Sequence, residues 1–369
     1  MKILHTADWH LASPMEHRLP PEKAALRRKE LQSRFADMVQ YAVDGGFSAV
    51  LLCGDLSDDG VLPYSVQEYL LTLIADAAPV RFFLLAGNHD RETADTVGGA
   101  FTRGRQQIPE NLHIFGPQFE TVTLGTGVTV SGCCLSGETG GDVFAALPAD
   151  TYNIVMLHGQ LTDGSGPLGG EGELLPMGSL RGRNTDYLAL GHEHTFRHGR
   201  LDARCTYCYC GCPEGRGFDE CGAHGFVVLT LDGNRCRGAE FVPFAKRVLH
   251  DLSLDITAVP GGIRETEQAL GQLIREIPTQ DFVRVTVCGE EDPDTQRDLS
   301  YLEQRLEQRF FYAEIRDRRV LKADLRAYEN DVSLRGAFVR QVLSADLPED
   351  EKQAILRCGL SALRGETDI

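Results

Sequence analysis

Short apolar runs recur along the first part of the chain, and helical patterns separate them. The runs cover Lys2–His5, Ala49–Leu52 and Val80–Leu85, while Pro21–Val43 and Tyr64–Ala77 repeat their apolar positions with helical spacing. Uninterrupted apolar runs are typical of strands buried on both faces, and their alternation with helices is typical of a parallel sheet. The pattern therefore predicts an α/β fold.

The middle of the chain is richer in strand patterns than in helical ones. Strands are expected at Leu112–Phe115, Glu120–Leu124, Val128–Ser131, Asn153–His158 and Tyr187–Leu190. The later runs Phe226–Leu231 and Glu240–Phe244 are expected to close a second sheet.

The order of strand and helix patterns changes near His250. Three strand patterns alternate with two helical ones, which predicts a βαβαβ unit, with strands at Leu252–Ile256, Phe282–Cys288 and Phe311–Ile315 and helices at Ile263–Ile277 and Thr295–Phe310. Two further apolar stripes, around Phe338 and Leu356, predict a terminal helical hairpin that must bury its apolar face on its own body or on a partner. We therefore expect a first domain of residues 1–247, a small α+β domain of residues 248–322 and a helical hairpin of residues 323–369.

Composition narrows the class of protein. The chain has 369 residues, of which 42% are hydrophobic, enough for a full core in one large and one smaller domain. It has no apolar run of about eighteen residues and opens on a strand pattern, so we expect a cytoplasmic protein without a membrane segment. A net charge of −17 disfavours a protein that grips a nucleic-acid backbone unaided, although bound cations or a partner could offset this charge. Arg27 and Arg28 lie on the polar side of the first helical pattern and are expected to face solvent.

Polar clusters stand directly after five of the apolar runs. They are Asp8-Trp9-His10, Gly54-Asp55-Leu56-Ser57-Asp58, Gly87-Asn88-His89-Asp90, Leu157-His158-Gly159 and Gly191-His192-Glu193-His194. Open α/β sheets place their functional groups just beyond the carboxyl ends of the strands. These clusters are therefore expected to meet in one site.

Seven side chains of these clusters are candidate metal ligands: Asp8, His10, Asp55, Asn88, His158, His192 and His194. Carboxylate, imidazole and amide donors suit manganese, iron or zinc better than calcium. Seven ligands exceed the needs of one ion, so we expect two ions about 3.5–4 Å apart, as in many hydrolytic sites. Asp55 is the best candidate for bridging them, because it stands between the Asp8/His10 pair and the remaining ligands along the chain.

The order of the clusters resembles that of the calcineurin-like metallophosphoesterases. The shared pattern is Asp-x-His, Gly-Asp-x-x-Asp, Gly-Asn-His-Asp, His-Gly and Gly-His-x-His. Within that family, residues 2–11, 187–194 and 211–218 are similar to the DNA-repair exonuclease group, which includes the SbcD-type nuclease subunits. The resemblance covers about residues 1–245 and implies a two-sheet sandwich flanked by helices.

The resemblance also implies roles for individual residues. Asp8, His10, Asp55 and His194 would hold one ion, and Asp55, Asn88, His158 and His192 would hold the other. His89 would face the scissile phosphate and protonate or stabilise the leaving oxygen, and Asp58 would orient His89. The implied cofactors are two divalent metal ions, expected to be Mn²⁺, with Fe or Zn as alternatives.

Three functions follow from these observations. The first, which the resemblance to the exonuclease group implies, is a Mn-dependent DNA exonuclease subunit that works in DNA repair with an SMC-type coiled-coil ATPase, docked through residues 331–369. The second is a phosphodiesterase acting on small phosphate esters or cyclic nucleotides, which the acidic charge favours. The third is a mainly architectural subunit of an ATPase complex. The helical pattern at Tyr64–Ala77 could also serve a homodimer, although a helix packed on the core has the same pattern.

A group of cysteines lies outside the five clusters. Cys205, Cys208, Cys210 and Cys212, with Cys221 downstream, invite comparison with a structural zinc site. Such sites prefer two well-separated ligand pairs, whereas alternating cysteines on one strand share a face and would crowd. Thiols are the expected state, and metal binding by these cysteines is left open.

Overall fold

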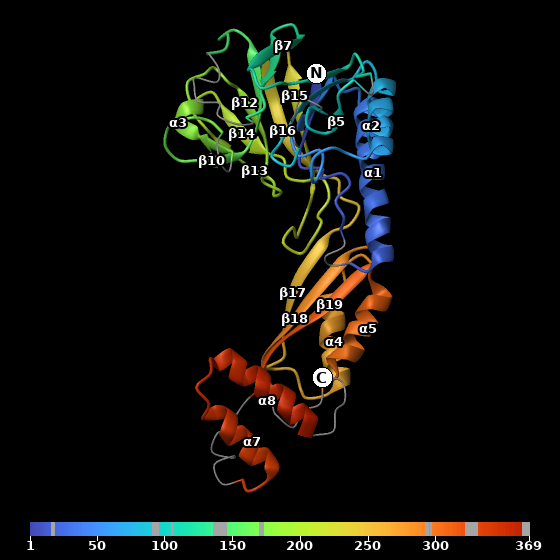
Figure 1. Ribbon diagram of the computed structural model, residues 1–369, viewed down its shortest axis with the longest axis vertical. Helices are drawn as coiled ribbons and strands as arrows, with labels where there is room; N and C mark the ends of the chain where they lie inside the picture. The colour runs from blue at the N-terminus through green and yellow to red at the C-terminus, as the bar shows by residue number, and fades with distance from the viewer. Residues whose placement is uncertain are drawn as a thin grey trace. The chain divides into compact units, whose positions relative to one another are not determined.

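The computed structural model describes residues 1–15, 19–90, 96–104, 107–135, 146–169, 173–291, 295, 297–321 and 331–363. The chain divides into two units, Met1–Val248 and Leu249–Ile369, and each is described by itself (Figure 1). The expected boundary between residues 322 and 323 falls outside the described residues. The division into three domains therefore stays a prediction.

The first unit contains a six-stranded sheet whose central strands are parallel. Its strands are β1 (Lys2–Thr6), β2 (Ala49–Cys53), β3 (Arg81–Leu85), β6 (Leu112–Ile114), β15 (Gly225–Asp232) and β16 (Arg235–Pro243). Their order is β16-β15-β1-β2-β3-β6, and β1, β2, β3 and β6 run parallel. The parallel alignment sends the carboxyl ends of β1, β2 and β3 to the same edge of the sheet.

The expectation that the last two strands of this unit close a second sheet was wrong. β15 pairs antiparallel with β1, with Lys2 opposite Thr230, and β16 pairs with β15. Both strands therefore belong to the first sheet. An apolar pattern shows which faces of a strand are buried, but it does not show which distant strand is its partner.

A second six-stranded sheet faces the first. It consists of β7 (Glu120–Gly125), β8 (Val128–Gly132), β9 (Tyr152–His158), β12 (Tyr187–Gly191), β13 (Arg197–Arg200) and β14 (Thr206–Tyr209) in the order β13-β14-β12-β9-β8-β7. The four inner strands are parallel, and the edge strands β7 and β13 are antiparallel to their neighbours. Smaller elements complete the unit: β4 (Thr96–Val97) with β5 (Phe101–Thr102), β10 (Gln160–Thr162) with β11 (Leu174–Pro176), and α3 (Met177–Leu180).

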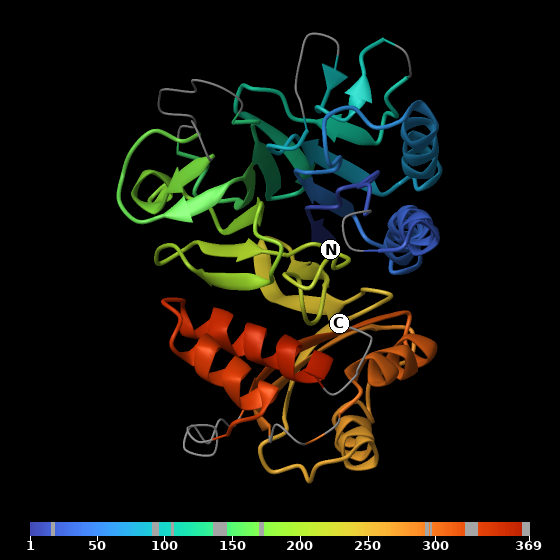
Figure 2. The same ribbon diagram turned by 60° about the horizontal axis from the view of Figure 1, so that its bottom comes forward.

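The buried strands of the first sheet contribute to two cores, which explains their uninterrupted apolar runs. On β1, Ile3 lies in the core between the sheets, while Leu4 lies in the core beneath α1 (Pro21–Asp44) and α2 (Tyr64–Asp76). Figure 2 shows these two helices side by side along the first sheet. The predicted sandwich flanked by helices is confirmed. A homodimer through α2 stays a prediction.

Arg27 of α1 was expected to face solvent, and this was wrong. Its side chain is only 1% exposed. Its guanidinium contacts Glu30 through Nη1 and Glu214 through Nη2, each at 3.0 Å. Carboxylates from the same helix and from a distant loop replace water around this arginine, as burial of a charge requires.

The second unit is a three-stranded parallel sheet with two helices packed on it. The elements follow in the order β17 (Leu249–Asp255), α4 (Ile263–Leu273), β18 (Phe282–Glu291), α5 (Leu299–Arg309) and β19 (Tyr312–Leu321). The predicted βαβαβ order is therefore confirmed. α7 (Leu334–Leu343) and α8 (Glu349–Leu363) follow, and their apolar stripes pack against each other through Val339, Val342, Leu356 and Leu360. Among the described residues, none of the helices has the length and apolar character that crossing a membrane requires.

Candidate metal centre

The polar clusters converge where the parallel strands of the two sheets of the first unit end. Asp8 and His10 follow β1, Asp55 follows β2, and Asn88 and His89 follow β3. The second sheet contributes His158 at the end of β9, with His192 and His194 after β12. The contacts below show that the structure brings all seven predicted ligands together.

Four of the predicted ligands have a left-handed backbone, which is unfavourable for residues other than glycine. Their φ angles are 53° at Asp8, 43° at His10, 50° at Asp55 and 103° at His192. Backbone hydrogen bonds stabilise the turns, since Asp8 N donates to Gly54 O at 3.0 Å and His10 N donates to Asp55 O at 2.9 Å. Strain of this kind persists at functional sites because the surrounding structure imposes it.

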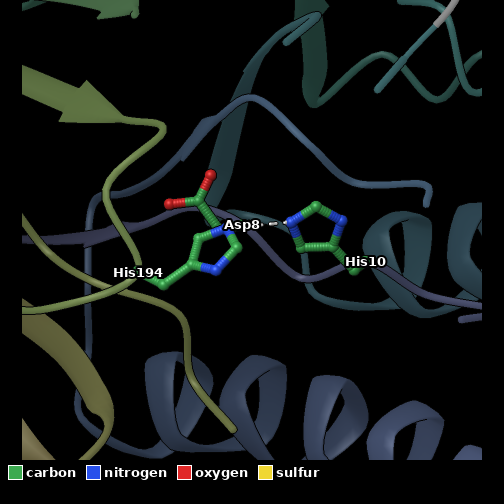
Figure 3. Close-up of side chains that lie close together, drawn as sticks. All are labelled: Asp8, His10 and His194. Carbon is green, nitrogen blue, oxygen red and sulfur yellow. Dashed lines mark hydrogen bonds between the residues drawn. The ribbon is translucent and has the colours of Figure 1, made fainter. Parts of the chain in front are cut away.

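Asp8, His10 and His194 form the first group of donors (Figure 3). Each offers one ligand atom, and these atoms lie within 4.8 Å of one another. His10 Nε2 and His194 Nε2 face each other at 3.2 Å. When two imidazole nitrogens bind the same ion, each at about 2.1 Å, they lie roughly this far from each other. The distance between the two histidine nitrogens therefore fits a shared cation.

A second group of donors surrounds His158. Its Nε2 atom lies 3.0 Å from Asn88 Oδ1 and 3.3 Å from Asp55 Oδ2, and His192 Nδ1 lies 3.1 Å from Asn88 Oδ1. Asp55 Oδ2 is also 3.8 Å from His10 Nε2. The Asp55 carboxylate therefore lies between the two groups. Imidazole nitrogens with carboxylate and amide oxygens suit manganese, iron or zinc.

Burial and mutual charge strongly perturb the ligands. Burial raises the pKa of Asp8 to about 7. Burial also acts to raise the pKa of Asp55, but its bond to His158 and the nearby His10 outweigh this and lower that pKa. The same contact with Asp55 overcomes the effect of burial on His158 and raises the pKa of its imidazole. Because metal ligands must be deprotonated, a cation bound here would compete with protons for these groups.

His89 and Asp58, the predicted catalytic residues, lie beside the first group. His89 Nδ1 lies 2.8 Å from the backbone oxygen of Asp58, and the His89 side chain is exposed. The prediction had the Asp58 side chain orient His89. In the structure its carboxylate instead lies 3.0 Å from His10 Nδ1 and 3.0 Å from Arg216, so the backbone carbonyl makes the contact with His89.

The sequence analysis missed two residues that support His194. Glu220 Oε1 lies 2.6 Å from His194 Nδ1, and Arg216 contacts the same oxygen at 3.1 Å. A carboxylate on the far nitrogen of a metal-binding histidine fixes its tautomer and the orientation of its ring. Neither residue stands at a strand end, so the pattern that identified the ligands gave no signal for them.

Asp90, the last residue of its cluster, is a structural partner of the site. Its carboxylate accepts hydrogen bonds from the backbone N–H groups of Leu56, Ser57 and Gly87 at 2.8–3.1 Å. Burial raises the pKa of Asp90 to about 6. The side chain thus joins the turns that carry Asp55 and Asn88.

The cysteines of the 205–212 stretch are buried, and none of the eleven cysteines, all of which lie in the described part of the chain, forms a disulfide. Cys208 and Cys210 lie in the core between the sheets, whereas Cys205 lies in the core on the other face of the second sheet. Cys212 Sγ is 3.2 Å from His224 Nδ1. Cys205 and Cys208 therefore belong to different cores, although only three positions separate them.

Comparison with known proteins identifies a family that this chain matches. A family model described as calcineurin-like phosphoesterase matches residues 1–196. A curated relative from Bacillus subtilis, one of the subunits of the nuclease SbcCD, is 25% identical over 270 residues, which cover 62% of this chain and 66% of that protein. This chain thus spans just under two thirds of the length of that relative.

Solved structures with a similar arrangement share little sequence. A dimetal phosphatase from Danio rerio is 12% identical, with a TM-score of 0.39 over 66% of this chain and 96% of that one. GAP50, "the anchor in the inner membrane complex of Plasmodium", is 13% identical, with a TM-score of 0.39 over 67% of this chain and 89% of that one.

Proposed function

Because this chain belongs to the calcineurin-like phosphoesterases, we propose that its strand-end site is a two-metal centre that hydrolyses phosphodiester bonds in DNA. The observation that carries the proposal is the convergence of seven candidate ligands in two groups, with Asp55 between them. The name of the Bacillus subtilis relative, a nuclease subunit, supports a nucleic acid as the substrate among phosphate esters, and the resemblance of the sequence to the DNA-repair exonuclease group favours DNA. Mn²⁺ is the expected ion, with Fe or Zn as alternatives.

The ligands divide as their contacts suggest. Asp8, His10, Asp55 and His194 would hold one ion, and Asp55, Asn88, His158 and His192 would hold the other. When bound, the two ions would activate a water molecule and neutralise charge on the phosphate. Glu220 orients His194, and the Asp58 carboxylate orients His10.

His89 is the residue placed to act on the leaving oxygen. Its ring lies 4.9 Å from that of His10, edge to face, and the Asp58 carbonyl holds Nδ1. In its protonated form the ring donates from both nitrogens, so Nδ1 satisfies the carbonyl while Nε2 donates to the leaving oxygen. General acid catalysis of this kind contributes about 10²–10⁴-fold to a rate.

The purified chain with Mn²⁺ is therefore expected to degrade end-labelled linear duplex DNA. His89→Ala should lower the rate by about 10²-fold or more, because the leaving oxygen loses its proton donor. Mn²⁺ binding by this variant should remain, since His89 is not among the ligands. The assay follows the labelled products over time beside a panel of small phosphodiesters.

The same panel of substrates tests the second candidate function, a phosphodiesterase that acts on small phosphate esters, against the nuclease proposal. The net charge of −17 favours a small phosphodiester or a cyclic nucleotide over DNA. Turnover of small diesters without degradation of DNA, even with a candidate ATPase present, would replace the nuclease proposal. Bound metal with no turnover of either substrate would support the architectural alternative.

An ATPase partner would explain how so acidic a chain acts on DNA. We propose, as part of the nuclease assignment, that an SMC-type coiled-coil ATPase docks on the described part of residues 331–369, which is 331–363. The two helices of the hairpin bury their apolar stripes against each other, yet Val332 remains 99% exposed and Leu334 remains 73% exposed. These side chains are available to a partner.

Charge placed at these two positions is expected to abolish binding to the ATPase. The variant combines Val332→Asp with Leu334→Asp, which removes apolar contact area and leaves the cluster between α7 and α8 untouched. The measurement is co-purification with a candidate long coiled-coil ATPase from the same organism. Tyr301→Asp, at a 40% exposed side chain on α5, is the matched control and should bind normally. Unimpaired binding of the double variant would place the dock elsewhere.

A further inference from the structure

Glu173 places another carboxylate beside the second group of donors. One ligand atom each from His158, Glu173 and His192 lie within 4.8 Å of one another, and Glu173 Oε2 is 3.9 Å from His158 Nε2. Among the described residues, this oxygen is buried without a hydrogen-bond partner. A buried carboxylate oxygen left unsatisfied is costly, so its position calls for a cation or a donor.

The backbone fixes where this carboxylate stands. Glu173 has a φ of 47°, a left-handed conformation that glutamate rarely adopts. Gln160 N donates to Glu173 O at 3.0 Å, and the parallel pairing of β10 with β11 continues this contact. A Cβ atom on Gly159 would come within 2.1 Å of the same oxygen, so the glycine after His158 permits the close approach. Strain at a residue that is held this firmly is typical of functional positions.

We propose that Glu173 is an eighth ligand and completes the second metal position with His158 and His192. The inference rests on the proposed function, because it requires a cation at that position. Asp8 and Asp55 supply two carboxylates, and Glu173 makes a third against the four positive charges of two divalent ions. An added carboxylate oxygen favours Mn²⁺ over Zn²⁺ at this position, since Mn²⁺ prefers oxygen donors.

The test is a Mn²⁺ titration of the metal-free full chain, in which electron paramagnetic resonance measures free Mn²⁺. The wild-type chain should bind two ions. Glu173→Gln keeps the size of the side chain, and it should weaken the second ion by about tenfold or more without changing the first. At the second position, this variant should lose less affinity for Zn²⁺ than for Mn²⁺, each compared with the wild-type chain. Glu173→Asp keeps the carboxylate on a shorter stem and should recover part of the Mn²⁺ affinity.

Glu193→Gln is the matched control, because it removes a carboxylate between two ligands in the sequence. The Glu193 side chain contacts Arg197 and Gln160, each at 3.0 Å. Both Mn²⁺ affinities should be unchanged in this variant. Equal weakening in Glu193→Gln, or normal binding by Glu173→Gln, would overturn the inference and leave the nuclease proposal standing. A wild-type chain that binds no Mn²⁺ would overturn both.

Discussion

Asp55→Asn is expected to lower phosphodiesterase activity by about 10³-fold, which corresponds to about 4 kcal/mol of transition-state stabilisation. The Asp55 carboxylate lies between the two groups, with its Oδ2 atom 3.8 Å from His10 Nε2 and 3.3 Å from His158 Nε2. Asparagine keeps the shape of the side chain but removes its charge. Both metal positions should therefore weaken together, which a Mn²⁺ titration beside the activity assay would show.

Asp59→Asn provides the control for this variant. Asp59 is exposed on the same turn and belongs to neither donor group, so its loss should change neither metal binding nor rate. Loss of a single ion in Asp55→Asn, with the other bound normally, would contradict the bridging position. The role of Asp55 would then be confined to one of the two groups.

The sequence predicted the parts of the site that depend on strand ends. The apolar runs of β1, β2, β3, β9 and β12 are uninterrupted because both faces of each strand are buried, and the polar cluster follows where each strand ends. Parallel pairing then brings these ends to one edge, as the principle of open sheets requires. Local pattern and global fold agree at these positions.

Other features depend on contacts that no local pattern encodes. The β15 strand pairs with β1 from the far end of the first unit's sequence, and Glu220 reaches His194 from a loop without regular spacing. Glu173 lies beside His158 because Gly159 admits its carbonyl. Arg27 looked like a surface residue because the sequence of its helix reveals only which positions are apolar. It does not reveal the carboxylate from a distant loop that contacts Arg27 on the polar side of the helix.

The ion pairs around Arg27 link this helix to the site. Glu30 accepts from Arg27 and Arg247, and Glu214 accepts from Arg27 at 3.0 Å. The loop that carries Glu214 continues to Arg216, whose guanidinium contacts Asp58 at 3.0 Å and Glu220 at 3.1 Å. Replacing a whole buried ion pair with hydrophobic residues is often neutral for stability, whereas removing one partner leaves a buried charge without its counter-charge.

Arg27→Met is expected to destabilise the first unit by about 3–5 kcal/mol, since it leaves Glu30 and Glu214 buried with one partner fewer. Trp9 is the single tryptophan of the chain and packs against Phe35 of α1, so its fluorescence during urea unfolding reports on this unit. Lys29→Met, at an exposed position of the same helix, should change stability by less than about 0.5 kcal/mol.

The effect of Arg27→Met should shrink in acid. Burial acts to raise the pKa of Glu30, but Arg247, Arg27 and Lys246 outweigh it and lower that pKa from 4.5 to about 2. A lowered carboxyl pKa stabilises the fold fully above the ordinary value, and this stability is lost as the pH falls toward the lowered one. The difference between wild type and variant should therefore narrow between pH 4.5 and about 2. A difference that stays constant over this range would show that the ion pair between Arg27 and Glu30 contributes little to stability, because that contribution depends on the charge of Glu30.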